Sequence, residues 1–436
     1  MSANFKKYPK VLVISHNPFC IYQNNGKTIS SIFKSWPSNK IRQLYFSSEM
    51  PNSSICRDYF RLSDADQVKS LFKIFSLKGK SFKLKEDLIP SNETKSGILS
   101  FLWEVIPKKN SFMLILRDIL WNLRGKTDES LDEWIDDFNP DIIFFVASNS
   151  VFSYEIAIEL RDKLNIPLVP FFTDDYIMPN GSYNPFAYFQ RKRVTKRFKN
   201  IISSSSEMFV IGELMMEEYS SKFGKKFSIV SNYPQSNKII LPKKVRENDE
   251  PLKLIYSGNI ELGRFKKLLD IAYAIEKLSK IGLNINLYIY SLQKPLRNDL
   301  KKINELSSTK FMGSLQDSDK IKNTIKEADI VLHVESDKKK FKKITKYSVS
   351  TKISEYLSYS KCILAYGPHD IASMSYLEKY KSALICHDKK DVYDKLYKIY
   401  KDRNIQIYYE NKAMELFKLK KNTLVVEDII ISAANQ

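Results

Sequence analysis

Short apolar runs of strand length alternate with helical stretches along this chain, and few folds satisfy that pattern. Residues 10–15 (KVLVIS) and 141–147 (DIIFFVA) are expected as strands, and helices are expected after them, over about 28–35 and 151–164. Such alternation indicates βαβ units and a parallel sheet. The other strand-like segments of the first half are 40–46, 166–172, 200–203 and 227–230, the last two flanking an expected helix at 207–222.

A polar, proline-punctuated segment at 231–251 interrupts the pattern and is the best linker candidate. The alternation then restarts with a strand at 252–256. We therefore expect an N-terminal domain over 1–232, a C-terminal domain over 252–415, and a C-terminal helix within 416–436 that returns to the first domain. Later elements of the second half are expected at 264–279, 283–290, 329–335, 361–366, 383–386, 391–401 and 404–416. Ligands usually bind in the cleft between two such sheets.

An aromatic-rich segment within residues 73–126 does not fit this rhythm. Residues 97–124 carry four cations among apolar residues and are broken by Pro107. Two interpretations stay open: an interfacial helix pair that contacts lipid headgroups, and an ordinary insertion packed on the first domain.

Composition limits the partners and the compartment. The chain has 70 Lys and Arg against 50 Asp and Glu, a formal net charge of +20, which favours polyanions unless it only reflects a lysine-rich surface. No window has the length of a spanning helix, and the N-terminal apolar run is too short for a signal peptide. The four scattered cysteines favour a reducing cytoplasm. We expect a cytoplasmic protein, with the inner face of the plasma membrane as a peripheral location.

Two segments of the second half could hold a nucleoside diphosphate sugar. The stretch SGNIELGR (257–264) follows a strand and opens a helix, so its glycines allow close approach and Arg264 can clamp phosphate. In STKISEYLS (350–358), Ser350 and Thr351 precede Lys352, and Glu355 lies one turn further on the same face. Lys352 would then meet a phosphate and Glu355 a ribose, although a surface ion pair is the alternative interpretation.

These segments resemble retaining GT-B glycosyltransferases of family 4, in the bacterial branch that builds capsule, O-antigen or exopolysaccharide. The resemblance rests on SGNIELGR, HVES (333–336), STKISEYLSYSKCILAYGP (350–368) and SYLEKY (375–380), and more weakly on FFTDDY (171–176) and 203–232. It implies an α/β fold of two Rossmann-like doubly wound domains facing a cleft.

The resemblance also implies residue roles and a mechanism. The acceptor hydroxyl would attack from the face at which the nucleotide departs, without a metal ion. The departing phosphate would take the acceptor proton, and cations would stabilise the negative charge that develops on this phosphate. Asp174 falls near the transferred sugar, and Arg264 and Lys352 contact the diphosphate. Donor-binding positions are Gly26, Gly258, Asn259, Arg264, Met312, Gly313, Ser350, Thr351, Lys352 and Glu355. No cofactor is expected; the donor is a nucleotide sugar, UDP-linked or GDP-linked, and the acceptor a glycan or polyprenyl-pyrophosphate-linked oligosaccharide.

Three departures from the family pattern are visible. Asn259 stands where relatives have an arginine, and the first-half loop has one glycine, Gly26, where two are common. Glu335 and Glu355 are twenty residues apart instead of eight, because a basic insert at 337–347 separates them. Glu335 is therefore doubtful as the second acid of the motif.

The sequence leaves other functions open. The D-x-D triplets at 64–66 and 317–319 resemble metal sites but are interpreted as helix caps. A nucleic-acid-binding protein would use the basic runs at 190–197 and 338–346, although no reading module is present. A catalytically silent homologue that acts as an assembly partner is the third alternative.

Overall fold

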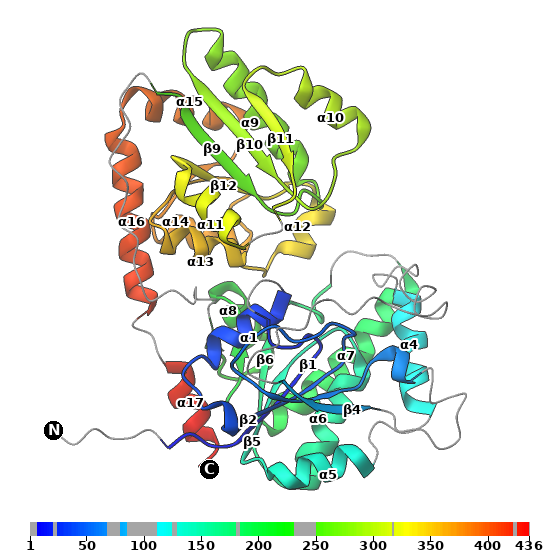
Figure 1. Cartoon of the computed structure of the whole chain (residues 1–436). Coiled ribbons are helices and arrows are strands. Elements are labelled where there is room, and N and C mark those ends of the chain that lie inside the picture. The colour runs from blue at the N-terminus through cyan, green and yellow to red at the C-terminus, as the bar shows by residue number, and fades with distance from the viewer. Residues whose placement is uncertain are drawn as a thin grey trace, which may run out of the picture. The chain divides into compact units, whose positions relative to one another are not determined.

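The computed structural model describes residues 7–20, 24–67, 79–84, 111–123, 129–179, 184–230, 250–315, 318–421 and 425–435. The chain divides into two compact units (Figure 1). The first comprises Met1–Ser231 together with Leu424–Gln436, and the second Asn232–Thr423. Most of the unusual segment at 73–126 lies outside the described residues, apart from 79–84 and 111–123.

The first unit is built on an eight-stranded sheet with the order β4-β3-β2-β1-β5-β6-β7-β8. All strand pairs are parallel except the antiparallel pair of β3 and β4. The strands are β1 (Val11–Ser15), β2 (Ile41–Tyr45), β3 (Asp58–Arg61), β4 (Lys80–Lys83), β5 (Ile142–Val146), β6 (Leu168–Phe172), β7 (Phe209–Val210) and β8 (Ser228–Ile229). The helices are α1 (Asn24–Ile32), α4 (Ser111–Leu123), α5 (Glu129–Phe138), α6 (Val151–Leu164), α7 (Pro185–Ser204), α8 (Glu213–Phe223) and α17 (Val425–Ala433).

The second unit has a six-stranded sheet with the order β11-β10-β9-β12-β13-β14, and its described pairs are parallel. Its strands are β9 (Leu252–Ser257), β10 (Ile285–Tyr290), β11 (Thr309–Gly313), β12 (Ile330–Val334), β13 (Cys362–Tyr366) and β14 (Leu384–Cys386). Its helices are α9 (Arg264–Ser279), α10 (Arg297–Asn304), α11 (Ser318–Glu327), α12 (Lys339–Thr345), α13 (Thr351–Ser358), α14 (Ala372–Lys379), α15 (Lys389–Lys401) and α16 (Asn404–Lys421).

Strand residues of the second unit alternate between two apolar cores. Leu254 and Leu332 lie in the core shared with α9 and α15, whereas Ile255 and Val331 lie in the core shared with α13 and α16. Because both faces of β12 (IVLHV) and β13 (CILAY) are covered, all of their residues are buried and nearly all are apolar. These continuous apolar runs identified the two strands correctly, and the expected doubly wound α/β class is confirmed.

Several segments differ from expectation. Residues 200–203, expected as a strand, form the end of helix α7, and the helix expected at 207–222 begins only at Glu213. Strands β3, β4, β7 and β11 were not expected. Helix α7 begins at Pro185, and the side chain of its N-cap, Asn184, accepts a hydrogen bond from the Phe186 backbone N–H. Its buried residues, Gln190, Val194, Phe198, Ile201 and Ile202, recur at helical spacing. A four-residue window was too short to reveal that period.

Candidate functional site

Strands β9 and β12 lie side by side at the centre of the second sheet, where the strand order reverses. From β9 the chain continues to β10 and β11 on one side, and from β12 to β13 and β14 on the other. Ligands of open α/β sheets bind at such a switch point, beyond the carboxyl ends of the strands. Ser257 ends β9, and Glu335 directly follows β12.

Lys352 is held at this switch point. Helix α13 begins with Ser350 as its N-cap, because the Ser350 side chain accepts a hydrogen bond from the Lys352 backbone N–H. The Lys352 Nζ donates to Ser257 Oγ at 3.2 Å. The side chain thus reaches from the first turn of α13 to the end of β9.

Helix α13 carries two further residues that were expected at the donor site. Thr351 is its first residue and is exposed, whereas Glu355 is half-buried one turn beyond Lys352. Residues three apart share a helix face, so the acid follows the cation along one side of α13. The next residue, Tyr356, is buried and donates from its hydroxyl to the Ser257 carbonyl at 3.5 Å, which fixes the helix against β9.

Arg264 occupies the first turn of α9 and forms an ion pair with Glu335 through one nitrogen that contacts both carboxylate oxygens. Its Nη2 lies 2.9 Å from Glu335 Oε1 and 3.1 Å from Oε2. Burial raises the pKa of Glu335, and the charge of Arg264 opposes that shift. Since Glu335 follows β12 and Lys352 contacts the end of β9, the two cations are attached to the same edge of neighbouring strands.

Glu335 is the residue that motif spacing had made doubtful. The insert at 337–347 forms helix α12 and does not displace Glu335 from the edge. Around this insert, Lys342 pairs with Asp370 at 2.6 Å, and the Lys346 carbonyl accepts from the Ala372 N–H at 2.7 Å. The insert is therefore an additional packed helix, and spacing in sequence was a poor measure of distance in space.

The loop before Arg264 is tied down by its own polar groups. Asn259 Oδ1 accepts from the Glu261 N–H at 2.6 Å, and the Asn259 carbonyl accepts from the Tyr256 hydroxyl at 2.6 Å. A Cβ on Gly258 would lie 2.8 Å from that hydroxyl, so only glycine fits. The Gly258 N–H donates to the Tyr290 carbonyl at 3.0 Å. Gly258 thus permits close packing, and its N–H is already engaged within the sheet.

Met312 and Gly313 lie at the end of the edge strand β11, two strands from β9. The Met312 side chain is exposed, and the Gly313 carbonyl accepts from the Ser291 N–H at 2.8 Å. This is the same carboxyl edge of the sheet, on the side away from β12.

Candidate residues of the first unit also come together. Gly26, expected in a loop, lies in the first turn of helix α1, and the neighbouring Asn25 donates from Nδ2 to Thr173 Oγ1 at 3.0 Å, which links this turn of the helix to the end of β6. A Cβ on Gly26 would lie 2.3 Å from the Pro18 carbonyl oxygen, so this close approach also requires glycine. Asp174 Oδ2 accepts from the Tyr176 hydroxyl at 3.3 Å.

The neighbouring carboxylate, Asp175, holds a turn. It accepts from the Ile177 and Met178 N–H groups at 3.1 and 3.0 Å and from the Tyr219 hydroxyl at 2.8 Å. No helix begins in the described residues 173–179, so Asp175 is not a helix cap, and a functional role for Asp174 stays open.

The acidic triplet at 64–66 and His333 have structural partners, whereas Asp317 of the second triplet lies outside the described residues. Asp64 Oδ1 accepts from Arg117 and Trp121, and Asp66 accepts from the Ser63 hydroxyl. Buried His333 contacts Ser373 Oγ at 2.9 Å, and burial lowers its pKa to about 3. Within the described ranges, no cluster of three or more His, Cys, Asp or Glu could hold a metal ion.

No protein-family model and no curated protein sequence matches this chain. Solved structures do match over nearly its whole length. Anabaena HepE in complex with UDP-glucose has a TM-score of 0.57 at 10% identity, covering 98% of this chain and 99% of that one. WaaG, a glycosyltransferase involved in lipopolysaccharide biosynthesis, has a TM-score of 0.54 at 10% identity, covering 98% of both chains.

A third similar structure is sucrose-phosphate synthase from Thermosynechococcus elongatus, with a TM-score of 0.54 at 11% identity and coverage of 98% of this chain and 96% of that one. These similarities establish the fold: the chain has the GT-B fold, with two Rossmann-like units. In the described residues, no helix has both the length and the apolar character needed to cross a membrane.

Proposed function

We propose that the chain transfers a sugar from a nucleoside diphosphate donor to a glycan or lipid-linked oligosaccharide. The main supporting observation is that two cations lie at one edge of the sheet. Lys352 donates to Ser257 at the end of β9, and Arg264 pairs with Glu335 at the end of the neighbouring strand β12. Two cations and two helix N-termini at one switch point suit a pyrophosphate. The fold is shared with HepE, which was solved with UDP-glucose.

The residue roles follow from this arrangement. Lys352 and Arg264 bind the diphosphate, and Glu355 accepts hydrogen bonds from the two ribose hydroxyls. Ser350 and Thr351 begin helix α13, which carries Lys352 and Glu355. Gly258 and Asn259 shape the loop before Arg264. Met312 and Gly313 border the nucleobase. In the first unit, Asp174 orients the sugar or acceptor beside Gly26 in the first turn of α1.

The proposed reaction retains the anomeric configuration. The bond between the sugar C1 and the β-phosphate oxygen breaks while the acceptor oxygen bonds to C1 from the same face. The acceptor proton moves to the departing phosphate oxygen, so no strong protein base is needed. Lys352 and Arg264 stabilise the negative charge that develops on the phosphate, which is where preorganised cations act most strongly.

Two cations fulfil the charge-neutralising role that a divalent metal plays elsewhere, and we therefore propose a metal-independent reaction. The donor is a UDP-sugar, with GDP-sugars as the alternative, and the product belongs to surface polysaccharide synthesis. An anionic membrane surface then brings the enzyme to a lipid-linked acceptor.

The test is release of UDP or GDP from a panel of nucleotide sugars, with and without EDTA, for the wild type and Glu355→Ala. We expect one donor class to turn over in both conditions and the variant to lose activity. Glu276→Ala, on α9, is a matched control. Full activity of Glu355→Ala would refute this site, and donor binding without turnover by the wild type would favour the silent homologue.

A further inference from the structure

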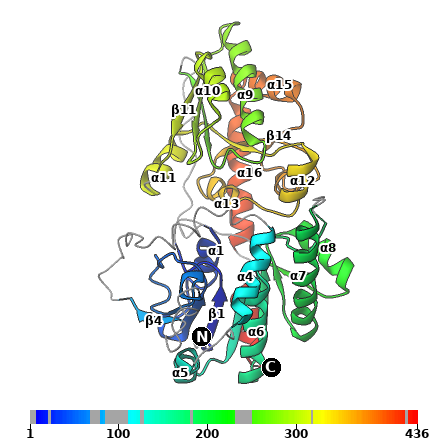
Figure 2. The ribbon, with the colours of Figure 1, turned by 90° about the vertical axis from the view of Figure 1, so that its right-hand side faces the viewer.

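Exposed aromatic and aliphatic side chains gather on helices α4 and α7 of the first unit. The described residues include fifteen exposed large hydrophobic side chains, and six of them lie on these two helices: Phe112, Leu116, Ile119, Phe186, Tyr188 and Phe189. The two helices run side by side in both views (Figures 1 and 2). The centroids of the Phe112 and Phe186 rings lie 5.1 Å apart, so the exposed residues of the two helices form one apolar patch.

The patch stands on a rigid base. Gln190 and Arg193 of α7 both bind the buried Asp118 of α4, at 2.8 and 3.1 Å. Asp118 in turn accepts from the Val151 N–H at 3.0 Å, which caps α6. The Arg193 guanidinium lies 5.9 Å from the Phe189 ring centroid. The aromatic residues are thus held outward by a buried network and are not the frayed end of a loose helix.

Lysines continue from the patch along α7. Tyr188, Lys192 and Lys196 are all exposed and recur every four residues, so they follow one side of the helix. At 1.5 Å per residue, the two lysines lie about 6 and 12 Å beyond Tyr188 along the axis. That spacing matches an interfacial anchor, in which aromatic rings enter the headgroup boundary and lysines meet anionic headgroups.

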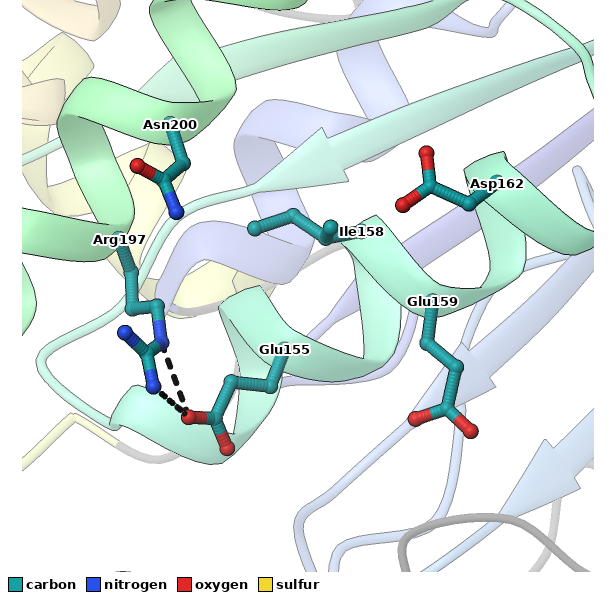
Figure 3. Close-up of a pocket in the computed structure, with 6 residues that line it drawn as sticks. All are labelled: Glu155, Ile158, Glu159, Asp162, Arg197 and Asn200. Carbon is teal, nitrogen blue, oxygen red and sulfur yellow. Dashed lines mark hydrogen bonds and ion pairs between the residues drawn. The ribbon is translucent and has the colours of Figure 1, made fainter.

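Acidic residues lie away from the patch, on α6. Glu155, Glu159 and Asp162 border a surface hollow beside Arg197 and Asn200 (Figure 3). Arg197 and Asn200 belong to the last turns of α7, whereas the aromatic residues belong to its first turn. The cations of α7 thus adjoin the apolar patch, whereas these three acids lie on the neighbouring helix α6.

We propose that the apolar patch and the adjoining lysines of α7 dock the first unit on an anionic lipid bilayer. The paired chemistry of aromatic rings and an adjacent lysine stripe favours lipid over a protein partner. This inference does not rest on the proposed glycosyl transfer, because the binding can be measured without a donor or an acceptor.

The test is cosedimentation of the full chain with vesicles of phosphatidylcholine alone or with added phosphatidylglycerol. We expect binding only with phosphatidylglycerol and release by high salt. The triple change Phe186→Ser, Tyr188→Ser and Phe189→Ser should reduce partitioning at least about tenfold. Replacing Lys192 and Lys196 with Gln should reduce it roughly 25-fold, at about fivefold per lysine.

Matched controls come from exposed residues of the second unit. Leu292→Ser with Leu296→Ser removes apolar surface, and Lys277→Gln with Lys280→Gln removes the same charge. Both controls should bind as the wild type does. Equal binding to both vesicle types, or wild-type binding by the aromatic triple variant, would overturn the proposal.

Sedimentation velocity without vesicles separates lipid docking from self-association. If the wild type dimerises and the aromatic triple variant is monomeric, the patch binds a second copy and the lipid assignment is wrong. Circular dichroism and thermal melting of each variant show whether it is folded, so that loss of binding can be attributed to the surface.

Discussion

Lys352 joins the first turn of α13 to the end of β9 through one side-chain hydrogen bond. A lysine at this position adds a point charge to the positive end of a helix, and both favour a phosphate. If it stabilises the departing phosphate, its loss should affect the chemical step more than the fold.

We expect Lys352→Ala to lower kcat by about 10²- to 10³-fold, by analogy with other charge-stabilising donors. Steady-state kinetics with the active donor measure this, and Lys277→Ala on the distant end of α9 is the control. An unchanged kcat for Lys352→Ala would show that this lysine is not part of the reaction.

A second prediction for individual residues concerns the ion pair of Arg264 and Glu335. Breaking a buried pair leaves one uncompensated charge, so Glu335→Ala should lower the free energy of unfolding by about 3 kcal/mol. Replacing both residues, as Arg264→Met and Glu335→Leu, should cost less than the sum of the single changes. Urea unfolding measures all variants, and additive costs would contradict the coupling.

His333 makes the free energy of unfolding depend on pH. Burial lowers the pKa of His333 to about 3, below its ordinary value near 6.5. The unfolded chain then takes up a proton as the pH falls below 6.5 while the folded chain does not. This contribution to stability is complete above that pH and is lost progressively toward pH 3.

We expect the wild type to lose about 1.4 kcal/mol per pH unit below 6.5 relative to His333→Asn, which cannot titrate. Urea unfolding at pH 7.0 and 5.5 gives the comparison. The same pH dependence in both proteins would show that His333 does not cause it.

Among the secondary-structure elements, the first turns of α9 and α13 place Arg264 and Lys352 at the edge of the sheet. Ser350 caps α13, so the Ser350→Ala variant should lower the free energy of unfolding by about 1 kcal/mol and weaken nucleotide binding as the helix start loosens. Ser350→Asn should restore the stability, since asparagine caps equally well. Thermal melts with and without UDP test both effects. Equal stability of Ser350→Ala and wild type would exclude the capping role.

Local patterns predicted the elements that carry strong local signals. The polar cluster before Lys352 indicated the N-cap, and apolar runs such as 362–366 indicated buried strands, because these signals depend only on neighbouring residues. The Arg264–Glu335 pair was not predicted. It depends on the contact of two distant segments across neighbouring strands, and the insert that forms α12 disrupted the motif spacing on which the expectation relied.

At the scale of the whole molecule, the net charge of +20 does not act as one surface. In the basic run at 190–197, Arg193 binds Asp118 and Arg197 binds Glu155. In the run at 338–346, Lys342 binds Asp370. Several of these cations thus serve internal ion pairs, which weakens the argument for a nucleic-acid-binding protein.

The two-unit architecture was predictable from the repeated alternation of strands and helices, and the similar solved structures confirm the fold class. The donor, the acceptor and the linkage were not predictable, because they depend on a few side-chain positions that the fold tolerates in many forms.

The proposed function requires a diphosphate-binding site at the switch point of the second unit. Isothermal titration calorimetry of UDP and UMP with the wild type and Lys352→Ala tests it most directly. We expect UDP to bind at least about tenfold more tightly than UMP, since charge-assisted contacts contribute roughly 1.5–3 kcal/mol each, and Lys352→Ala to remove most of that difference. Equal affinity of the wild type for UDP and UMP, or an unchanged preference in Lys352→Ala, would contradict the account.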